Sequence, residues 1–159
     1  MTYTWATGGM IEFKHALNQG DMEMQKLPEA ASQSATKAGE PVYLVSGAVT
    51  ICGNDAATVF GILMEDCTGT TGNMVLVNRI RTGDVYEANV VSDHTPGTDI
   101  FRGCKYGIDR TGAGNWEIDA TATTYYGAIV LDYVETTPTA GGRVIFTFNP
   151  AVIQSVIGA

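Results

Sequence analysis

Apolar and polar residues alternate over many short stretches of this chain, and no long stretch keeps a helical period. The clearest alternation covers Arg143–Phe148, where every second side chain is apolar, as in a strand with one buried face. Val42–Val45 and Ala48–Cys52 flank Ser46-Gly47 and predict a hairpin, because glycine supplies the positive φ of a tight turn. Further strands are expected at 59–64, 74–79, 84–91, 106–109, 115–119 and 127–134. The pattern predicts an all-β fold, either a small barrel or a sandwich.

The chain also contains an internal repeat. Val59–Asp66 and Tyr125–Asp132 share an aromatic residue, a glycine, an apolar run and an acid, and Gly61 and Gly127 lie 127 − 61 = 66 positions apart. Glycine at the head of an apolar strand is expected where a bulge or a close backbone contact excludes a side chain. We therefore expect two tandem, related β units, which more often build a scaffold than a reactive centre. The expected organisation is an extended N-terminal arm (1–40), a first β unit (41–91), a connector (92–104), a second β unit (105–149) and a C-terminal tail (150–159).

Residues 1–40 differ from the rest, because no strand or helix period is sustained in them. One interpretation is a loosely ordered terminus. The other is an arm that folds against a neighbouring subunit or partner. In that case the partner-binding residues are the apolar ones: Trp5, Met10, Ile11, Phe13, Met22, Met24 and Leu27. We then expect a chain without residues 1–38 to keep its β body and to assemble less well.

Composition and charge narrow the class of partner. Hydrophobic residues make up 45% of the chain and charged residues 16%, so a sizeable core is expected. The net charge of −8 argues against nucleic acid, which needs clustered lysine and arginine. No apolar run approaches the ~20 residues of a membrane helix, and the first ten residues do not resemble a secretory signal. We expect a soluble protein made in a cytoplasm, with no nucleic-acid or membrane partner.

Groups of the kinds that form reactive sites are few and scattered. The three cysteines, an odd number without close spacing, are Cys52, Cys67 and Cys104. They predict neither disulfides nor a zinc site. Asp55, Asp84 and Asp119 lack the spacing of a calcium-binding loop, although a site built from several loops stays open as an alternative. No catalytic residue, cofactor or metal is therefore predicted.

Two alternatives from other functional classes use the remaining candidates. His94 beside Asp93 suits a hydrolase only if folding places it against carboxylates in a deep cleft. Trp116, Tyr125 and Tyr126 suit a carbohydrate-stacking platform only if they are exposed together. Core or interface packing is the commoner role of such aromatic residues.

Two segments resemble a known family. Lys37-Ala38-Gly39-Glu40-Pro41-Val42, followed after the Ser46-Gly47 turn by Ala56-Ala57-Thr58-Val59-Phe60-Gly61-Ile62-Leu63, is similar to the small capsid decoration, or cement, proteins of tailed bacteriophages. The similarity covers residues 37–66 and, more faintly, 105–148.

The resemblance implies a non-enzymatic β protein on the outer surface of an icosahedral head. Such proteins are commonly homotrimers that bridge neighbouring subunits of the major capsid protein, and some reach a neighbour with an N-terminal arm. The implied location is the virion capsid surface, after synthesis in the host cytoplasm. The alternative is a carbohydrate- or receptor-binding β module of a virion fibre or tail accessory.

Overall fold

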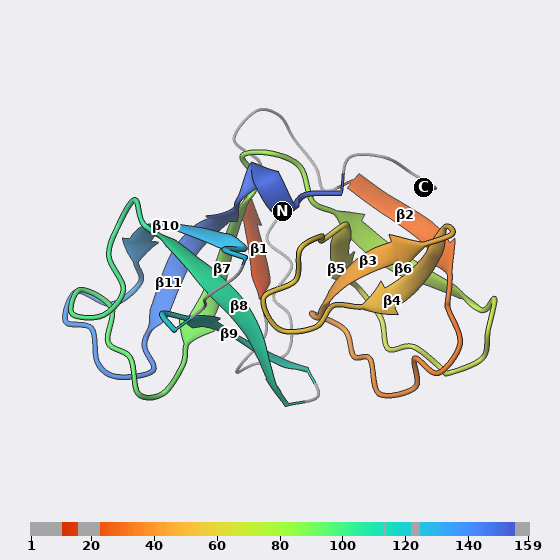
Figure 1. Cartoon of the computed structure of the whole chain (residues 1–159), viewed down its shortest axis with the longest axis horizontal. Helices are drawn as coiled ribbons and strands as arrows, with labels where there is room; N and C mark the ends of the chain where they lie inside the picture. Colours follow the sequence, from red (N-terminus) through yellow and green to blue (C-terminus); the bar gives the residue numbers. More distant parts are fainter. Residues whose placement is uncertain (1–10, 16–22, 113, 122–124, 155–159) are drawn as a thin grey trace.

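The protein consists of two small β-barrels that lie side by side (Figure 1). The computed structural model describes residues 11–15, 23–112, 114–121 and 125–154. The strands in this part of the chain are β1 (Glu12–His15), β2 (Glu23–Pro28), β3 (Pro41–Val45), β4 (Ala48–Ile51), β5 (Gly61–Leu63), β6 (Met74–Arg79), β7 (Val85–Val90), β8 (Lys105–Gly112), β9 (Asn115–Asp119), β10 (Ala128–Tyr133) and β11 (Arg143–Phe148). One short 3-10 helix, η1 (Pro150–Val152), follows β11. The all-β prediction with two tandem units is confirmed.

The second barrel closes completely. Its strands follow the order β7-β11-β10-β8-β9, and β9 returns to pair in parallel with β7 through Asn89↔Glu117 and Val90↔Ile118. β1 pairs antiparallel with the first half of β7. A closed barrel has no free sheet edge to aggregate, so a small domain gains both stability and solubility from closure.

The first barrel has the same strand order, β2-β6-β5-β3-β4. A single parallel bridge between Glu29 and Val49 closes it, and the Ala30 N–H donates to the Val49 carbonyl at 3.0 Å. The second barrel uses the same bond at its closure, where the Val91 N–H donates to the Ile118 carbonyl at 3.0 Å. The two units are therefore copies of one five-stranded plan.

Strand pairing gives the repeat a different register from the one expected. Gly61 is the first residue of β5 and pairs with both Val42 and Arg79. The first residue of β10, which pairs with both equivalent strands of the second barrel, is Ala128. The structural offset at this strand is thus 128 − 61 = 67, not 66, and Gly127 lies just before β10. The two glycines look alike in sequence but make different contacts.

Gly61 lies against a neighbouring backbone, as its position predicted. A Cβ there would lie 2.6 Å from the Asn78 carbonyl oxygen and 2.5 Å from Val77 Cγ1, both in β6. At Gly127 the nearest atom to such a Cβ is Ile108 Cδ1, a side-chain atom at 3.1 Å. A side-chain end can shift more easily than a strand backbone, so Gly61 is the more constrained of the two.

The described parts of the N-terminal region, residues 11–15 and 23–40, belong to the body rather than to a separate arm. Ile11 is fully buried in the main core, so it cannot contact a partner. β2, placed in the arm by its weak pattern, pairs along its whole length with β6. Met24 and Leu27 are half-buried in it, and Leu27 packs on the core of the first barrel. Removing residues 1–38 would delete this strand, so the β body is not expected to survive such a deletion intact.

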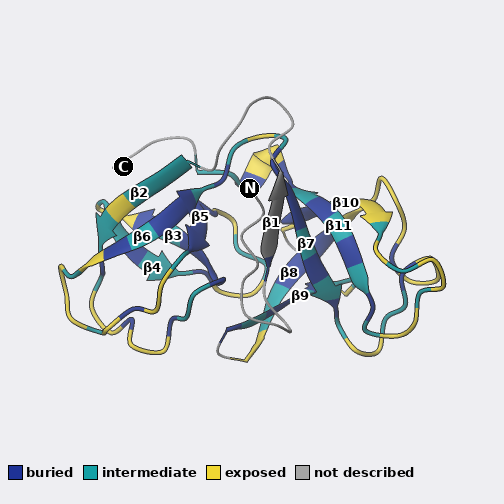
Figure 2. Ribbon diagram, turned by 180° about the vertical axis from the view of Figure 1, so that it is seen from behind, coloured by how far each residue is buried: buried dark blue, intermediate teal, exposed yellow. Residues whose placement is uncertain are grey.

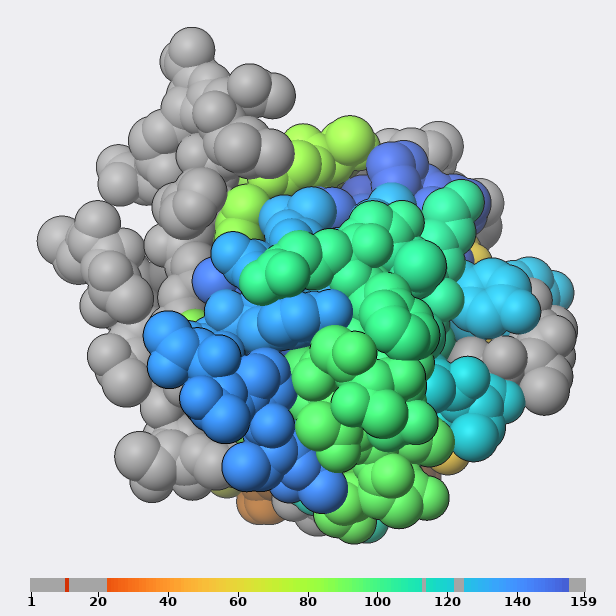
Figure 3. Space-filling model, turned by 90° about the vertical axis from the view of Figure 1, so that its left-hand side faces the viewer, coloured from red at the N-terminus to blue at the C-terminus, as the bar shows by residue number. Residues whose placement is uncertain are grey.

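Of the other residues expected in the arm, the structure describes Phe13. Phe13 lies in β1, where it pairs with Tyr86 of β7. Trp5, Met10 and Met22 lie outside the described residues. The sheets also divide the chain at residues 80–84, because β7 opens the second barrel rather than closing the first. The connector expected at 92–104 is instead a loop within the second barrel, and Figure 3 shows it (green) beside the loop before β11 (blue).

Each barrel has an apolar interior, and the larger core extends between them. The first barrel encloses Val42, Leu44, Val49, Phe60, Leu63, Cys67, Val75 and Val77. The second encloses the aromatic group Tyr86, Phe146 and Phe148, and its core reaches residues 52, 59, 62 and 80 of the preceding segment. Figure 2 shows the buried strands in dark blue and the exposed positions mainly in loops. No helix in the described part of the chain is long and apolar enough to cross a membrane.

Replacing Gly61 by alanine is expected to destabilise the protein by about 1–3 kcal/mol, because the added methyl group must displace the β6 backbone. Gly53→Ala is the matched control, since a Cβ there meets nothing within 4 Å. That control is expected to be neutral or slightly stabilising. Urea denaturation of both variants measures the difference, and equal midpoints would contradict the close contact at Gly61.

Candidate functional site

The contact between the two barrels, here called the junction, is held by hydrogen bonds between segments far apart in the sequence. The Val59 N–H donates to the Val152 carbonyl at 2.7 Å, and the Gln154 N–H donates to the Val59 carbonyl at 2.8 Å. The Gln154 side chain also bonds both backbone groups of Leu44, accepting from its N–H at 2.9 Å and donating to its carbonyl at 3.1 Å. The segment after β11 therefore ties the second barrel to the first.

The Glu40 carboxylate is the centre of the junction. It is fully buried and comes from the first barrel, directly before β3. Four donor atoms come from the β8–β9 hairpin of the second barrel: Arg110 Nε at 2.7 Å and Nη2 at 3.3 Å, the Gly114 N–H at 2.9 Å and Trp116 Nε1 at 3.0 Å. The Lys37 N–H, in the same turn as Glu40, adds a fifth bond at 2.6 Å. A buried charge is tolerated only when it is paired and hydrogen-bonded, and Glu40 meets both conditions.

A second buried carboxylate, Glu29, orders a loop within the first barrel. It accepts hydrogen bonds from the Thr68 and Gly69 N–H groups, both at 2.8 Å, and from Asn73 Nδ2 at 2.8 Å. Burial raises the pKa of Glu29, but these hydrogen bonds outweigh burial and hold it below the ordinary value. Glu29 therefore stays ionised and fixes the turn between β5 and β6.

Three aspartates meet on the outer side of the junction. Asp109 pairs with Glu117, and Gly107 pairs with Asp119, so the two aspartates are diagonal neighbours on one face of β8–β9. Asp55 reaches them from the loop 53–58 of the first barrel, where its N–H donates to the Ile108 carbonyl at 3.2 Å. This loop is called the junction loop below.

The three carboxylates do not all ionise easily. Burial, a hydrogen bond with Asp119 and the charges of Asp55 and Asp119 raise the pKa of Asp109 to about 7. Burial also raises the pKa of Asp119, but bonds from Thr121, Asp109 and His94 outweigh it and lower the net value. Two neighbouring carboxyl groups of this kind share one proton between them.

His94 does face a carboxylate, but not across a cleft. Its Nε2 lies 3.3 Å from Asp119 Oδ1 and 3.8 Å from Asp93 Oδ1. The sequence suggested only Asp93, because Asp119 is distant in the chain and reaches His94 through the strand β9. Among the described residues, no group of three or more histidine, cysteine, aspartate or glutamate side chains has the arrangement of a metal site.

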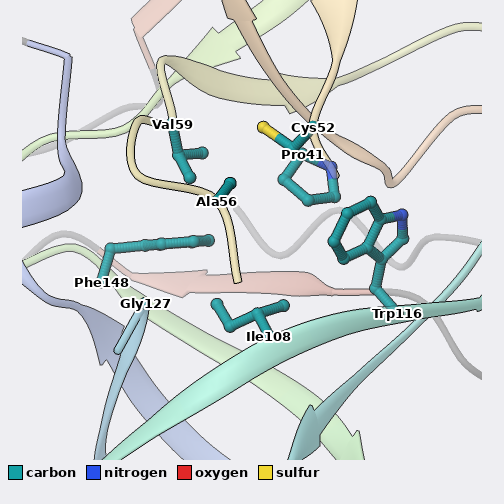
Figure 4. Close-up of a pocket in the computed structure, with 8 residues that line it drawn as sticks. All are labelled: Pro41, Cys52, Ala56, Val59, Ile108, Trp116, Gly127 and Phe148. Atoms are coloured by element: carbon teal, nitrogen blue, oxygen red, sulfur yellow. The ribbon is translucent and has the colours of Figure 1, made fainter. Parts of the chain in front are cut away.

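The hollows near the junction are small or open. Figure 4 shows an apolar pocket lined by Pro41, Cys52, Ala56, Val59, Ile108, Trp116, Gly127 and Phe148. Its free space is about 10 Å³, no more than one water molecule needs. A shallower hollow of about 270 Å³ is lined by Tyr43, Gly53, Ala56, Ala57 and Thr58. His94 lines neither hollow, so the geometry that a hydrolase requires is not met at these two places.

The arginine side chains pair with acidic residues of the same chain. Each of the five arginines forms an ion pair with an acid of the same chain: Arg79 with Glu23, Arg81 with Asp84, Arg102 with Asp132, Arg110 with Glu40, and Arg143 with Glu87. The remaining acids give the described surface its negative character. Such a surface favours a basic or apolar partner over a phosphate backbone.

The aromatic candidates are separated by the fold. Trp116 is buried in the core and donates to Glu40, so it cannot stack on a sugar. Tyr125 and Tyr126 are exposed just before β10. Phe101 and Leu131 are also exposed on the second barrel, and Leu131 is the unpaired residue of a bulge in β10. The apolar surface therefore lies mainly on the second barrel.

The comparisons with known proteins leave the family open. No protein-family model matches the chain, and no curated protein sequence matches it significantly.

Changing Glu40 to Gln is expected to destabilise the protein by about 2–4 kcal/mol. Breaking a fully buried ion pair costs ~3–5 kcal/mol, and the Arg110 side chain is 27% exposed, so water offsets part of the loss. Asp132→Asn is the control, since its pair with Arg102 is exposed and should leave the denaturation midpoint nearly unchanged. A Glu40→Gln midpoint equal to that of the control would contradict a central role for this carboxylate.

Changing Asp109 to Asn is expected to alter the pH dependence of stability. Because the pKa of Asp109 is raised on folding, its stabilising contribution is complete below about pH 4 and is lost as pH rises through about 7. The variant cannot lose this proton, so its melting temperature should rise relative to wild type between pH 5 and pH 8. Asp132→Asn should show no such change over this range. A constant difference between Asp109→Asn and wild type across the range would rule out the shared proton.

Proposed function

We propose that this chain is a structural, non-enzymatic virion protein that binds the outside of a phage capsid and cements neighbouring subunits of the major capsid protein. It acts at the capsid surface, after synthesis in the host cytoplasm, as a homotrimer. The observation that carries the proposal is the pair of related barrels, in which buried carboxylates hold segments of the chain together by hydrogen bonds. The carboxylate oxygens of Glu40 and Glu29 accept hydrogen bonds from backbone and side-chain donors of the same chain, as is expected of a structural scaffold.

The segment that resembles decoration proteins supports the same proposal. Lys37–Val42 forms the turn that presents Glu40 to the second barrel, with Gly39 at a φ of 89°. A rigid two-barrel body with exposed apolar residues suits a protein that makes many modest contacts on a symmetric shell. Symmetry multiplies such contacts, so the shell gains stability without one tight site.

Mixing the protein with undecorated heads of the phage that encodes it is expected to raise the temperature at which the heads release their DNA. The protein should also sediment with the heads. Phe101→Asp and Leu131→Asp on the second barrel, compared with Val45→Asp on the first, would show which barrel docks, since all three side chains are exposed. Heads that neither bind the protein nor gain stability would overturn the proposal.

One observation keeps the carbohydrate- or receptor-binding alternative in view. Tyr125 and Tyr126 are adjacent and exposed, although they lack the tryptophan expected beside them. Glycan-array binding that Tyr126→Ala abolishes, without any binding to heads, would favour that alternative.

A further inference from the structure

The second barrel carries an exposed copy of the surface by which the first barrel binds it. Equivalent residues are defined by strand pairing and by matching backbone bonds. The Gly39 N–H donates to the Leu63 carbonyl and the Gly103 N–H donates to the Val130 carbonyl, both at 2.7 Å. The turn that presents Glu40 therefore recurs in the second barrel, where Cys104 occupies the position of Glu40.

The residues of the first barrel that form the junction are buried. Glu40, Pro41, Cys52 and Val59 lie against the second barrel, and the last three line the apolar pocket of Figure 4. Strand pairing makes Val42, Val49 and Gly61 equivalent to Tyr106, Ile118 and Ala128. Counting along the chain from these positions, the equivalents of the four junction residues are, in the same order, Cys104, Lys105, Thr121 and Tyr126. All four equivalents are exposed. We call these four residues the open face.

The junction is a heterologous contact, because it joins different faces of two copies of one plan. The first barrel contributes the Glu40 turn and the junction loop, and the second contributes its β8–β9 hairpin. Among the described residues, the turn face of the second barrel has no barrel packed against it, and neither has the tip of the β3–β4 hairpin of the first barrel beyond Leu44. At that hairpin end, Val45 is exposed.

We propose that the open face binds the β3–β4 hairpin end of a second copy of this chain, so that copies associate head to tail. Heterologous contacts of this kind close into rings when the rotation allows, and otherwise continue as filaments. The exposed aromatic Tyr126 supplies apolar area, of the kind that dominates interface energetics. The proposal rests on the self-association stated above and names the surfaces that carry it.

The contact cannot copy the junction in every bond. Cys104 replaces the carboxylate of Glu40. The β3–β4 hairpin turns at Ser46-Gly47, directly after the pair Val45↔Ala48, whereas the β8–β9 hairpin continues past the equivalent pair Asp109↔Glu117 to Gly112↔Asn115. The Leu44 backbone is already bonded to Gln154 of the same chain. The interface must therefore rely on the apolar contact of Tyr126 with the hairpin end, and a weaker association than the junction is expected.

Analytical ultracentrifugation of the free protein over 1–200 µM tests the proposal. Wild type should form an oligomer, and Tyr126→Glu or Val45→Glu should each weaken association at least tenfold. Leu131→Glu is the matched control, because it is equally exposed on the second barrel but lies outside the open face. It should associate like wild type.

A mixture of the two weakened variants distinguishes a head-to-tail contact from a contact between two open faces. Tyr126→Glu keeps its hairpin end and Val45→Glu keeps its open face, so a head-to-tail contact predicts that the mixture forms a heterodimer. Contact between two open faces predicts no such rescue and would overturn the proposal. A wild type that stays monomeric at 200 µM, or a Leu131→Glu defect equal to that of Tyr126→Glu, would overturn it too. If such a monomer still binds heads, the capsid function stands and only the open-face contact fails.

Discussion

The structure depends on one buried charge, the Glu40 carboxylate between the two barrels. Removing an ion from water is costly, so this carboxylate is stable only while Arg110, Gly114 and Trp116 stay in place around it. These donors belong to one hairpin of the second barrel, and the acceptor belongs to a turn of the first. The two barrels are thereby held in one relative position by bonds that neither could satisfy alone.

The two barrels share one backbone frame but differ in the side chains on their surfaces. The closing backbone bonds at Ala30 and Val91 match in both barrels, as do the turns at Gly39 and Gly103. At the position of Glu40, however, the second barrel has an exposed cysteine. Backbone geometry is shared because strand order and closure require it, whereas side chains at the turn are free to change when their neighbours differ.

The same junction contains a second kind of carboxyl group, whose pKa is raised on folding. Burial, a hydrogen bond with Asp119 and the charges of Asp55 and Asp119 raise the pKa of Asp109 to about 7. Glu40 is compensated by a guanidinium and three other donors. The surroundings of the two carboxyl groups therefore differ, because a guanidinium contacts Glu40 whereas other carboxyl groups contact Asp109.

Local pattern determined the all-β class, most strand positions and the presence of two units. Period-two alternation at Arg143–Phe148 and the Ser46-Gly47 turn depend only on neighbours along the chain, so they can be recognised without coordinates. Tertiary structure alone decided the one-residue shift between Gly61 and Gly127 and the inclusion of β2 in the first barrel. It also decided the burial of Ile11, Glu40 and Trp116, since these depend on contacts between segments far apart in sequence. Burial of a charge needs partners that no local pattern contains, which is why the residues at the centre of this protein could not be identified from the sequence.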